Sequence, residues 1–300
     1  MRRHLPSARF WKSHLLHFSW TDPSRLAEEL SQDVAKFAAA VRAQGNAWIL
    51  LWCAGKGAMN SPTAALEPEW LAWNLLLDQL ATLANHLPGC IFLASSAGGV
   101  YGGNVSEQLT EYTLPRPNSE YGMHKLRMEE SLTNWTSSLS TCSCLIGRIS
   151  TLYGPGQDFR KAQGIISHLS RCLIYRHPVS IYVPLDTRRD YLFVDDCAEQ
   201  IAAGLQRTMN GGPQKVLKIF ASERSTSLAQ IVGIFFRIAK HRSLIFTRHG
   251  SGVQSISLNF RSTVWRDLEG VRKTDLSAGI HLLHEHQLAL FQRGMLQRPS

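Results

Sequence analysis

The chain has 300 residues, of which 44% are apolar, and a formal net charge of +9. This length and apolar content can bury a sizeable core, and no run of 18 or more apolar residues could span a bilayer. The positive charge favours an anionic partner, but Lys and Arg are dispersed, without a basic run interleaved with aromatic residues. A phosphorylated small molecule is therefore expected rather than nucleic acid or a membrane.

The basic start, Met1 to Pro6, leads into no apolar segment, so no secretory signal is predicted and a cytoplasmic protein is expected. Six cysteines are scattered without the spacing of metal ligands, and no metal site is predicted. They are expected to be buried, reduced thiols: Cys53, Cys90, Cys142, Cys144, Cys172 and Cys197.

The first predicted helix begins at Asp22-Pro23, where a capping side chain precedes a proline, and ends at Gly45. The apolar run 48–53 then predicts a strand that is buried on both faces. A second helix is predicted from Leu71 to Leu87, since its leucines recur at steps of three to five residues.

Next come a predicted strand from Cys90 to Ala94, a loop with two prolines, a helix from Tyr121 to Trp135 and a strand from Cys144 to Arg148. Helices thus alternate with apolar strands, which predicts an α/β fold with a doubly wound parallel sheet. In such sheets the active site lies at the carboxyl ends of the strands.

Beyond residue 160 the pattern loosens, which indicates a smaller lobe over residues 161–300 with some segments returning to the sheet. The elements expected there are helices at 165–173, 194–205 and 228–239 and a strand at 179–183. Asp195 and Asp196 are predicted to cap the second of these helices. Residues 297–300 are expected to fray.

Two residues that could carry chemistry, Tyr121 and Lys125, are four apart, so a helix places them on one face. The ammonium favours the phenolate, which can then accept a proton from a hydroxyl group. Alone the pair means little, because its spacing arises by composition in about one chain of this size in two. Ser95 and Ser96, however, end the preceding strand, where a hydroxyl could share a substrate oxygen with Tyr121.

These residues stand in order with two later segments, 148–157 (RISTLYGPGQ) and 188–196 (RRDYLFVDD). The ordered set resembles the extended short-chain dehydrogenase/reductase superfamily, and within it the NAD-dependent epimerase/dehydratase family of nucleotide-sugar enzymes. The resemblance runs from about Trp48 to Leu228. It implies a Rossmann-like dinucleotide-binding domain over residues 1–160, a substrate-binding lobe over 161–300, and NAD or NADP as cofactor.

By matching position, the resemblance makes Tyr121 the general base and Lys125 its partner, which also contacts the nicotinamide ribose. It makes Ser96, or else Ser95, the hydroxyl that orients the substrate. The other implied cofactor-binding residues are Cys53, Ala54, Gly55 and Asn74. The implied substrate-binding residues are Ser95, Thr151 and Arg189.

Arg189 would bind the substrate diphosphate, as a guanidinium can do with two hydrogen bonds. The alternative is a surface ion pair with Asp190 or Asp195. Thr151 stands where the family usually has asparagine, and it can donate only one hydrogen bond. Family members often pair through the tyrosine helix, so a homodimer through Leu126, Met128 and Leu132 is a further expectation.

A second departure from the family is larger. Its glycine-rich turn, which holds the cofactor pyrophosphate at a helix N-terminus, has no counterpart here, since Gly45 is the only glycine upstream of Trp48. The first βαβ unit is therefore expected to be missing. Because its first strand is central in the usual order, the sheet would be open, with Trp11 and Trp20 covering part of the exposed surface.

Three interpretations stay open. One is a nucleotide-sugar epimerase or related 4-keto reductase, in which Tyr121 takes the hydroxyl proton while hydride passes to NAD and back. A dehydratase is disfavoured, because residues 97–99 (AGG) supply no acid or base. Another is a truncated or degenerate member without cofactor binding that acts as a binding or scaffold protein. The last is a true start codon upstream of Met1.

Overall fold

In the computed structural model the described residues are 1, 3–5, 8–13, 15, 17–45, 47–104, 106–158, 164–181, 183–238, 245–247, 257–270 and 273–299. The chain forms two compact units. The first unit comprises Met1–Tyr101, Arg116–Arg148 and Ile201–Lys218. The second comprises Gly102–Pro115, Ile149–Gln200 and Ile219–Ser300.

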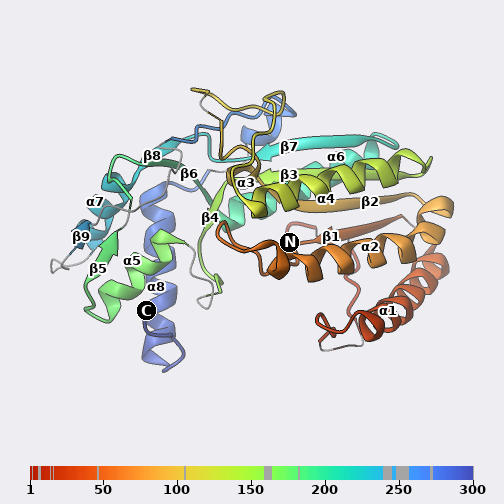
Figure 1. Cartoon of the computed structure of the whole chain (residues 1–300), viewed down its shortest axis with the longest axis horizontal. Helices are drawn as coiled ribbons and strands as arrows, with labels where there is room; N and C mark the ends of the chain where they lie inside the picture. The colour runs from red at the N-terminus through yellow and green to blue at the C-terminus, as the bar shows by residue number, and fades with distance from the viewer. Residues whose placement is uncertain are drawn as a thin grey trace. The chain divides into compact units, whose positions relative to one another are not determined.

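A four-stranded sheet with the order β1-β2-β3-β7 organises the first unit (Figure 1). Its strands are β1 (Trp48–Trp52), β2 (Gly89–Ser96), β3 (Cys142–Ile149) and β7 (Lys215–Phe220). β1 and β2 pair in parallel, with Trp48 opposite Gly89 and Trp52 opposite Leu93. The predicted α/β class with a parallel sheet is confirmed.

The helices of the first unit are α1 (Pro23–Gln44), α2 (Thr63–His86), the single turn α3 (Ala97–Val100) and α4 (Glu120–Ser137). α1 begins and ends as predicted: the Asp22 side chain accepts a hydrogen bond from the Arg25 amide, and Gly45 closes the helix with a φ of 63°. α2 packs against both α1 and α4, and α4 also packs on β2.

The prediction that β1 is buried on both faces was wrong. The strand ends at Trp52, its three central residues are only half-buried, and it forms an edge of the sheet, paired with β2 alone among the described residues. The Trp20 ring packs edge-on against Trp52, with 6.2 Å between their ring centroids. Trp20 thus covers part of β1, as the sequence predicted.

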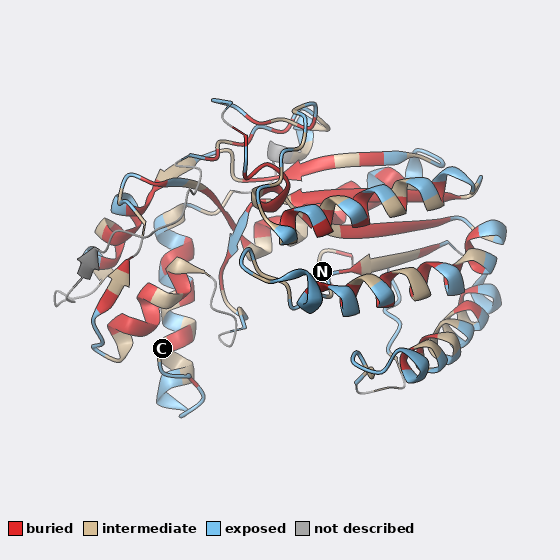
Figure 2. Ribbon diagram, in the orientation of Figure 1, coloured by how far each residue is buried: buried red, intermediate tan, exposed pale blue. Residues whose placement is uncertain are grey.

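The core of this unit is built from the inner faces of α1, α2 and α4 and from β1, β2 and β3, and Figure 2 shows β2 and β3 as mostly buried. Met128 and Leu132 are fully buried in that core, and Leu126 is half-buried. Their assignment to a dimer contact was therefore wrong for Met128 and Leu132, which face the sheet of their own chain. Met123 is the exposed apolar residue of α4.

The second unit contains two smaller sheets, β4-β6-β8 and β5-β9. Its strands are β4 (Thr151–Tyr153), β5 (Val179–Ile181), β6 (Arg188–Phe193), β8 (Ser225–Ser227) and β9 (Ile245–Thr247). Its helices are α5 (Ile165–Ile174), α7 (Leu228–Ile238), the 3-10 helix η1 (Arg266–Gly270) and α8 (Leu276–Gln292), while α6 (Val194–Asn210) runs through both units.

The predicted helices at 165–173, 194–205 and 228–239 correspond to α5, α6 and α7, although residue 239 lies outside the described residues. The predicted strand at 179–183 ends at Ile181, and residue 182 is likewise not described. Within the predicted tail, residues 297–299 lie outside helices and strands, and residue 300 is not described.

Asp195 and Asp196 lie inside the first turn of α6, not at its N-cap as predicted. The Asp196 carboxylate instead accepts hydrogen bonds from the Thr274 amide at 2.6 Å and the Thr274 hydroxyl at 2.7 Å. An acidic side chain in a first helical turn still interacts favourably with the helix dipole. Asp196 therefore joins the start of α6 to the segment that precedes α8.

Glu111 anchors the segment 102–115 within the second unit. Its carboxylate accepts hydrogen bonds from the Ile219 amide (2.9 Å), the Ser262 hydroxyl (2.5 Å) and the Thr263 amide (2.8 Å). Burial raises the pKa of Glu111, but these hydrogen bonds outweigh burial and hold the pKa below its usual value.

Glu111→Gln is therefore expected to lower the free energy of unfolding near neutral pH by about 1–3 kcal/mol. The reason is that the buried hydrogen-bond donors around residue 111 lose their charged acceptor. Since the folded pKa is depressed, the carboxylate stabilises the fold above its unfolded pKa of about 4.3, and this contribution is lost as pH falls through the folded value. Urea unfolding over the acid range should show a weaker pH dependence in Glu111→Gln than in the parent. An unchanged dependence would contradict this role.

Within the described part of the chain, no helix has the length and hydropathy needed to cross a membrane. None of the six cysteines, all of which the structure describes, forms a disulfide. Five are buried as predicted, but Cys53 is exposed, because it lies just beyond the end of β1.

Candidate catalytic site

Tyr121 lies in the first turn of α4, at the carboxyl ends of β1 and β2. The helix starts there because the Ser119 hydroxyl accepts a hydrogen bond from the Gly122 amide. The Tyr121 ring is held between two glycines: a Cβ built on Gly57 would lie 3.1 Å from the ring, and one built on Gly99 would lie 3.2 Å from it. The loop after β1 and the turn α3 after β2 therefore fix the position of the phenol.

Gly122 allows α4 to approach α3 closely. A Cβ on Gly122 would lie 2.1 Å from the Gly99 carbonyl oxygen, a contact that backbone atoms can relieve only by moving apart. Gly122→Ala is expected to lower the free energy of unfolding by about 1–3 kcal/mol. Gly98→Ala is the matched control, since a Cβ there meets nothing within 4 Å. Equal urea midpoints for the two variants would refute this tight approach.

Lys125 lies one turn further along α4, with its ammonium nitrogen 5.8 Å from the centroid of the Tyr121 ring. The same nitrogen donates a hydrogen bond of 2.7 Å to Glu69 Oε1 on α2. The side chains of Lys125 and Glu69 are only 6% and 7% exposed. The site thus contains a buried ion pair beside the phenol.

Glu69 was not predicted. Burial raises the pKa of its carboxyl, but hydrogen bonding to His124 and the charge of Lys125 outweigh burial and hold the pKa below its usual value. His124 Nε2 lies 3.5 Å from Glu69 Oε2. The available signal in the sequence was the position of Glu69, which lies three residues after Leu66 and four before Trp73. This spacing places a charged residue on the buried face of α2.

Both predicted serine hydroxyls are bonded within the first unit. The Ser95 hydroxyl donates to Glu129 Oε1 at 2.5 Å. The Ser96 hydroxyl accepts from the Gly99 amide at 3.1 Å and so caps α3. At the end of β2 the Tyr121 ring is in contact with Gly99, which has no side chain.

Glu129 belongs to a buried network that the sequence did not reveal. Arg148 on β3 binds Glu129 through Nε at 3.1 Å and through Nη2 at 2.6 Å. Arg148 Nη1 also donates to the Tyr101 hydroxyl at 2.5 Å. The spacing of Glu129, four residues after Lys125, was the available signal, since it places both on one helix face.

The other residues implied as cofactor-binding all belong to the first unit. Cys53, Ala54 and Gly55 follow the end of β1, and Gly55 has a φ of 130°. A Cβ on Gly55 would lie within 2.8 Å of three atoms of the Glu69 carboxylate. Asn74 lies on α2, where its amide nitrogen donates to the Trp70 carbonyl at 2.7 Å.

Thr151 and Arg189, implied as substrate-binding, lie in the second unit on the paired strands β4 and β6. Arg189 Nη1 donates to the Arg188 carbonyl at 2.8 Å. Burial lowers the pKa of Arg189, partly offset by Tyr191. Within the described ranges Arg189 makes no ion pair with Asp190 or Asp195, the alternative considered for it.

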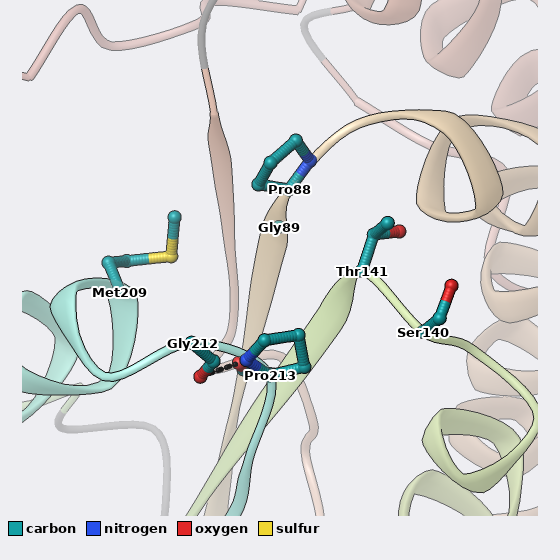
Figure 3. Close-up of a pocket in the computed structure, with 8 residues that line it drawn as sticks. Pro88, Gly89, Ser140, Thr141, Met209, Gly212 and Pro213 are labelled. Atoms are coloured by element: carbon teal, nitrogen blue, oxygen red, sulfur yellow. Dashed lines mark hydrogen bonds between the residues drawn. The ribbon is translucent and has the colours of Figure 1, made fainter.

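A pocket of about 290 Å³ lies elsewhere on the first unit (Figure 3). Its lining comes from the starts of β2 and β3, the segments just before β2, β3 and β7, and the last turn of α6: Pro88, Gly89, Ser140, Thr141, Ser143, Met209, Gly212 and Pro213. Tyr121 and the two serines lie at the opposite end of β2. The pocket is therefore separate from the candidate site.

Residues 55–219, more than half of the chain, match the NAD-dependent epimerase/dehydratase family. The dTDP-L-rhamnose 4-epimerase of Burkholderia thailandensis is 34% identical over 96 residues, which cover 32% of this chain and 26% of that enzyme. The dTDP-4-dehydro-6-deoxyglucose reductase of Escherichia coli is 29% identical over 154 residues, covering 51% and 47%. The chain thus spans about half or less of the length of these relatives.

Among solved structures, the UDP-glucose 4-epimerase of Thermotoga maritima with UDP-glucose superposes with a TM-score of 0.72 at 18% identity, covering 88% of this chain and 83% of that one. A UDP-glucuronic acid 4-epimerase from Bacillus cereus, in complex with UDP-glucuronic acid and NAD, gives a TM-score of 0.70 at 19% identity, covering 85% and 79%. At this identity the likeness shows a shared fold.

Proposed function

The chain belongs to the NAD-dependent epimerase/dehydratase family, and we propose that it is an NAD(P)-dependent epimerase, or a related 4-keto reductase, of a nucleotide sugar. The observation that carries the proposal is the pairing of Tyr121 with the buried Lys125 ammonium, 5.8 Å from the ring centroid. The Lys125 side chain is only 6% exposed, so its charged donor group is held close to the Tyr121 phenol. A phenol positioned beside such a group is suited to act as a general base for a sugar hydroxyl.

The residues present fit the nicotinamide end of the cofactor. An ammonium has three N–H donors, and Glu69 takes one from Lys125. The remaining donors suit the hydroxyls of a ribose. Gly55, with its left-handed φ and its lack of a side chain, lets ligand and backbone approach closely at the end of β1.

No residue is proposed for the pyrophosphate, because Gly45 is the only glycine before β1 and no glycine-rich turn stands there. When bound, NAD(P) would supply the acceptor and donor of a hydride. The chain's own part is to accept the proton of the sugar hydroxyl on the Tyr121 oxygen and, in the reverse step, to donate it back to the sugar oxygen. For the substrate, Arg189 is proposed to bind the diphosphate and Thr151 to make a substrate contact.

The test is incubation with dTDP- and UDP-linked hexoses, or their 4-keto forms, in the presence of NAD or NADPH. Proton NMR of the sugar separates the two activities: an epimerase inverts one carbon without net change in the cofactor, whereas a reductase consumes NADPH as the ketone disappears. A chain that changes none of these sugars under either condition would contradict the proposal.

A second candidate function, a binding or scaffold protein without catalysis, is favoured by one observation. The Ser95 hydroxyl donates its proton to Glu129 and the Ser96 hydroxyl caps α3, so both serines predicted to orient a substrate are engaged within the chain. If the chain is such a binding protein, we expect it to bind no NAD(H), which distinguishes this function from that of an epimerase or reductase.

A further inference from the structure

We propose that Glu69 is a positioning residue, which fixes the Lys125 ammonium beside Tyr121 and supplies the counter-charge of the site. The inference rests on the proposed function and adds a residue to it. Lys125 Nζ and Glu69 Oε1 are 2.7 Å apart, the geometry of a charge-assisted hydrogen bond. The two residues come from different helices, α4 and α2, and are 56 positions apart in the sequence.

Burial explains why Lys125 needs such a partner. A lone ammonium removed from water is costly, and a lysine side chain has several rotatable bonds through which it can reach solvent. Among the described residues, Lys125 Nζ also donates to the Met128 sulfur at 4.0 Å, which is a weak acceptor. Glu69 is therefore the group that holds the charge inside.

Glu69 is itself well placed to hold a fixed position. Its carboxylate packs directly on Gly55, where any side chain would displace it. Only one carboxylate oxygen is engaged with Lys125, while the other, Glu69 Oε2, lies 3.5 Å from His124 Nε2. Glu69 thus restrains Lys125 through one N–H and leaves the other donors of the ammonium for ligand hydroxyls.

The experiment measures how fast Lys125 is acetylated by acetic anhydride, with peptide mass spectrometry to follow each lysine. In Glu69→Gln the rate at Lys125 is expected to rise roughly tenfold or more, because the ammonium loses its buried partner. Glu67→Gln is the matched control, since Glu67 lies on the same helix in an exposed pair with Arg127. Lys218, which is 1% exposed on β7, reports general loosening of the same unit and is expected not to change.

If Glu69→Gln loosens the whole fold, a second variant, Glu69→Asp, tests the proposal. It keeps the charge but is one methylene shorter, so Lys125 alone should again react faster. Parent-like labelling of Lys125 in both Glu69 variants, or a parallel rise at Lys218 in both, would overturn the proposal. The assay needs neither cofactor nor substrate, so a failure of the proposed enzymatic function would appear separately, in turnover.

Discussion

Tyr121→Phe is expected to lower kcat by about 10²- to 10⁴-fold, the range in which a positioned general acid–base contributes to a reaction. The change removes one oxygen and leaves the ring that packs between Gly57 and Gly99. The fold should therefore be kept while the proton acceptor is lost. The measurement is turnover of the nucleotide sugar identified by the NMR screen, with circular dichroism to compare the folded states.

Tyr112→Phe is the control for the loss of a phenol, because Tyr112 is 85% exposed. Its turnover should equal that of the parent. If Tyr121→Phe turned over the sugar as fast as Tyr112→Phe does, Tyr121 would not be the base, and the proposed mechanism would be wrong.

Arg148→Met is expected to lower the free energy of unfolding by about 3–5 kcal/mol, because it leaves the buried Glu129 carboxylate without its partner. Arg148 and Glu129 side chains are 4% and 6% exposed, and the guanidinium makes three hydrogen bonds to that carboxylate. The Tyr101 hydroxyl loses a donor as well. Urea denaturation at neutral pH measures the loss.

Arg127→Met tests whether removal of any arginine has this effect. Arg127 pairs with Glu67 at 3.4 Å, and both side chains are about half exposed, so its loss should be much smaller. The double variant Arg148→Met/Glu129→Met should regain part of the stability of Arg148→Met, since it removes both buried charges. A double variant less stable than Arg148→Met would contradict the network.

Elements with strong local signals could be predicted from the sequence. The start and end of α1 follow from Asp22, Pro23 and Gly45, which act within a few residues of the helix ends. The burial of β1 could not be predicted, because it depends on which strands flank it. A run of apolar residues is the same for a central and an edge strand, and only the sheet order β1-β2-β3-β7 distinguishes them.

Of the short strands in the second unit, β5 was predicted, but β4, β6, β8 and β9 were missed for a related reason. β6 begins with Arg188, Arg189 and Asp190, three charged residues that lack the alternation expected of a strand. Asp190 is nevertheless 1% exposed, because the amides of Ser222 and Arg224 satisfy its carboxylate. Such partners lie more than 30 residues away in the sequence.

The candidate site was predictable in part. Tyr121 and Lys125 were predicted because their helical spacing stands in order with the serine pair and with two later segments, a set that resembles the family. Glu69 was missed because its partner is 56 residues distant, and a single glutamate on an amphipathic helix has no local signature of pairing. The serine hydroxyls were predicted as free groups, since the sequence does not show that Glu129 and the Gly99 amide engage them.

Calorimetric titration with NADH tests most directly whether this chain has a nicotinamide site built on Lys125. We expect saturable binding by the parent chain. Binding should be at least about tenfold weaker in the charge-neutral double variant Glu69→Gln/Lys125→Met, since the ammonium that would meet the ribose is gone. Equal affinity in the double variant would show that Lys125 does not form the site, and absence of saturable binding by the parent would favour a binding protein without catalysis.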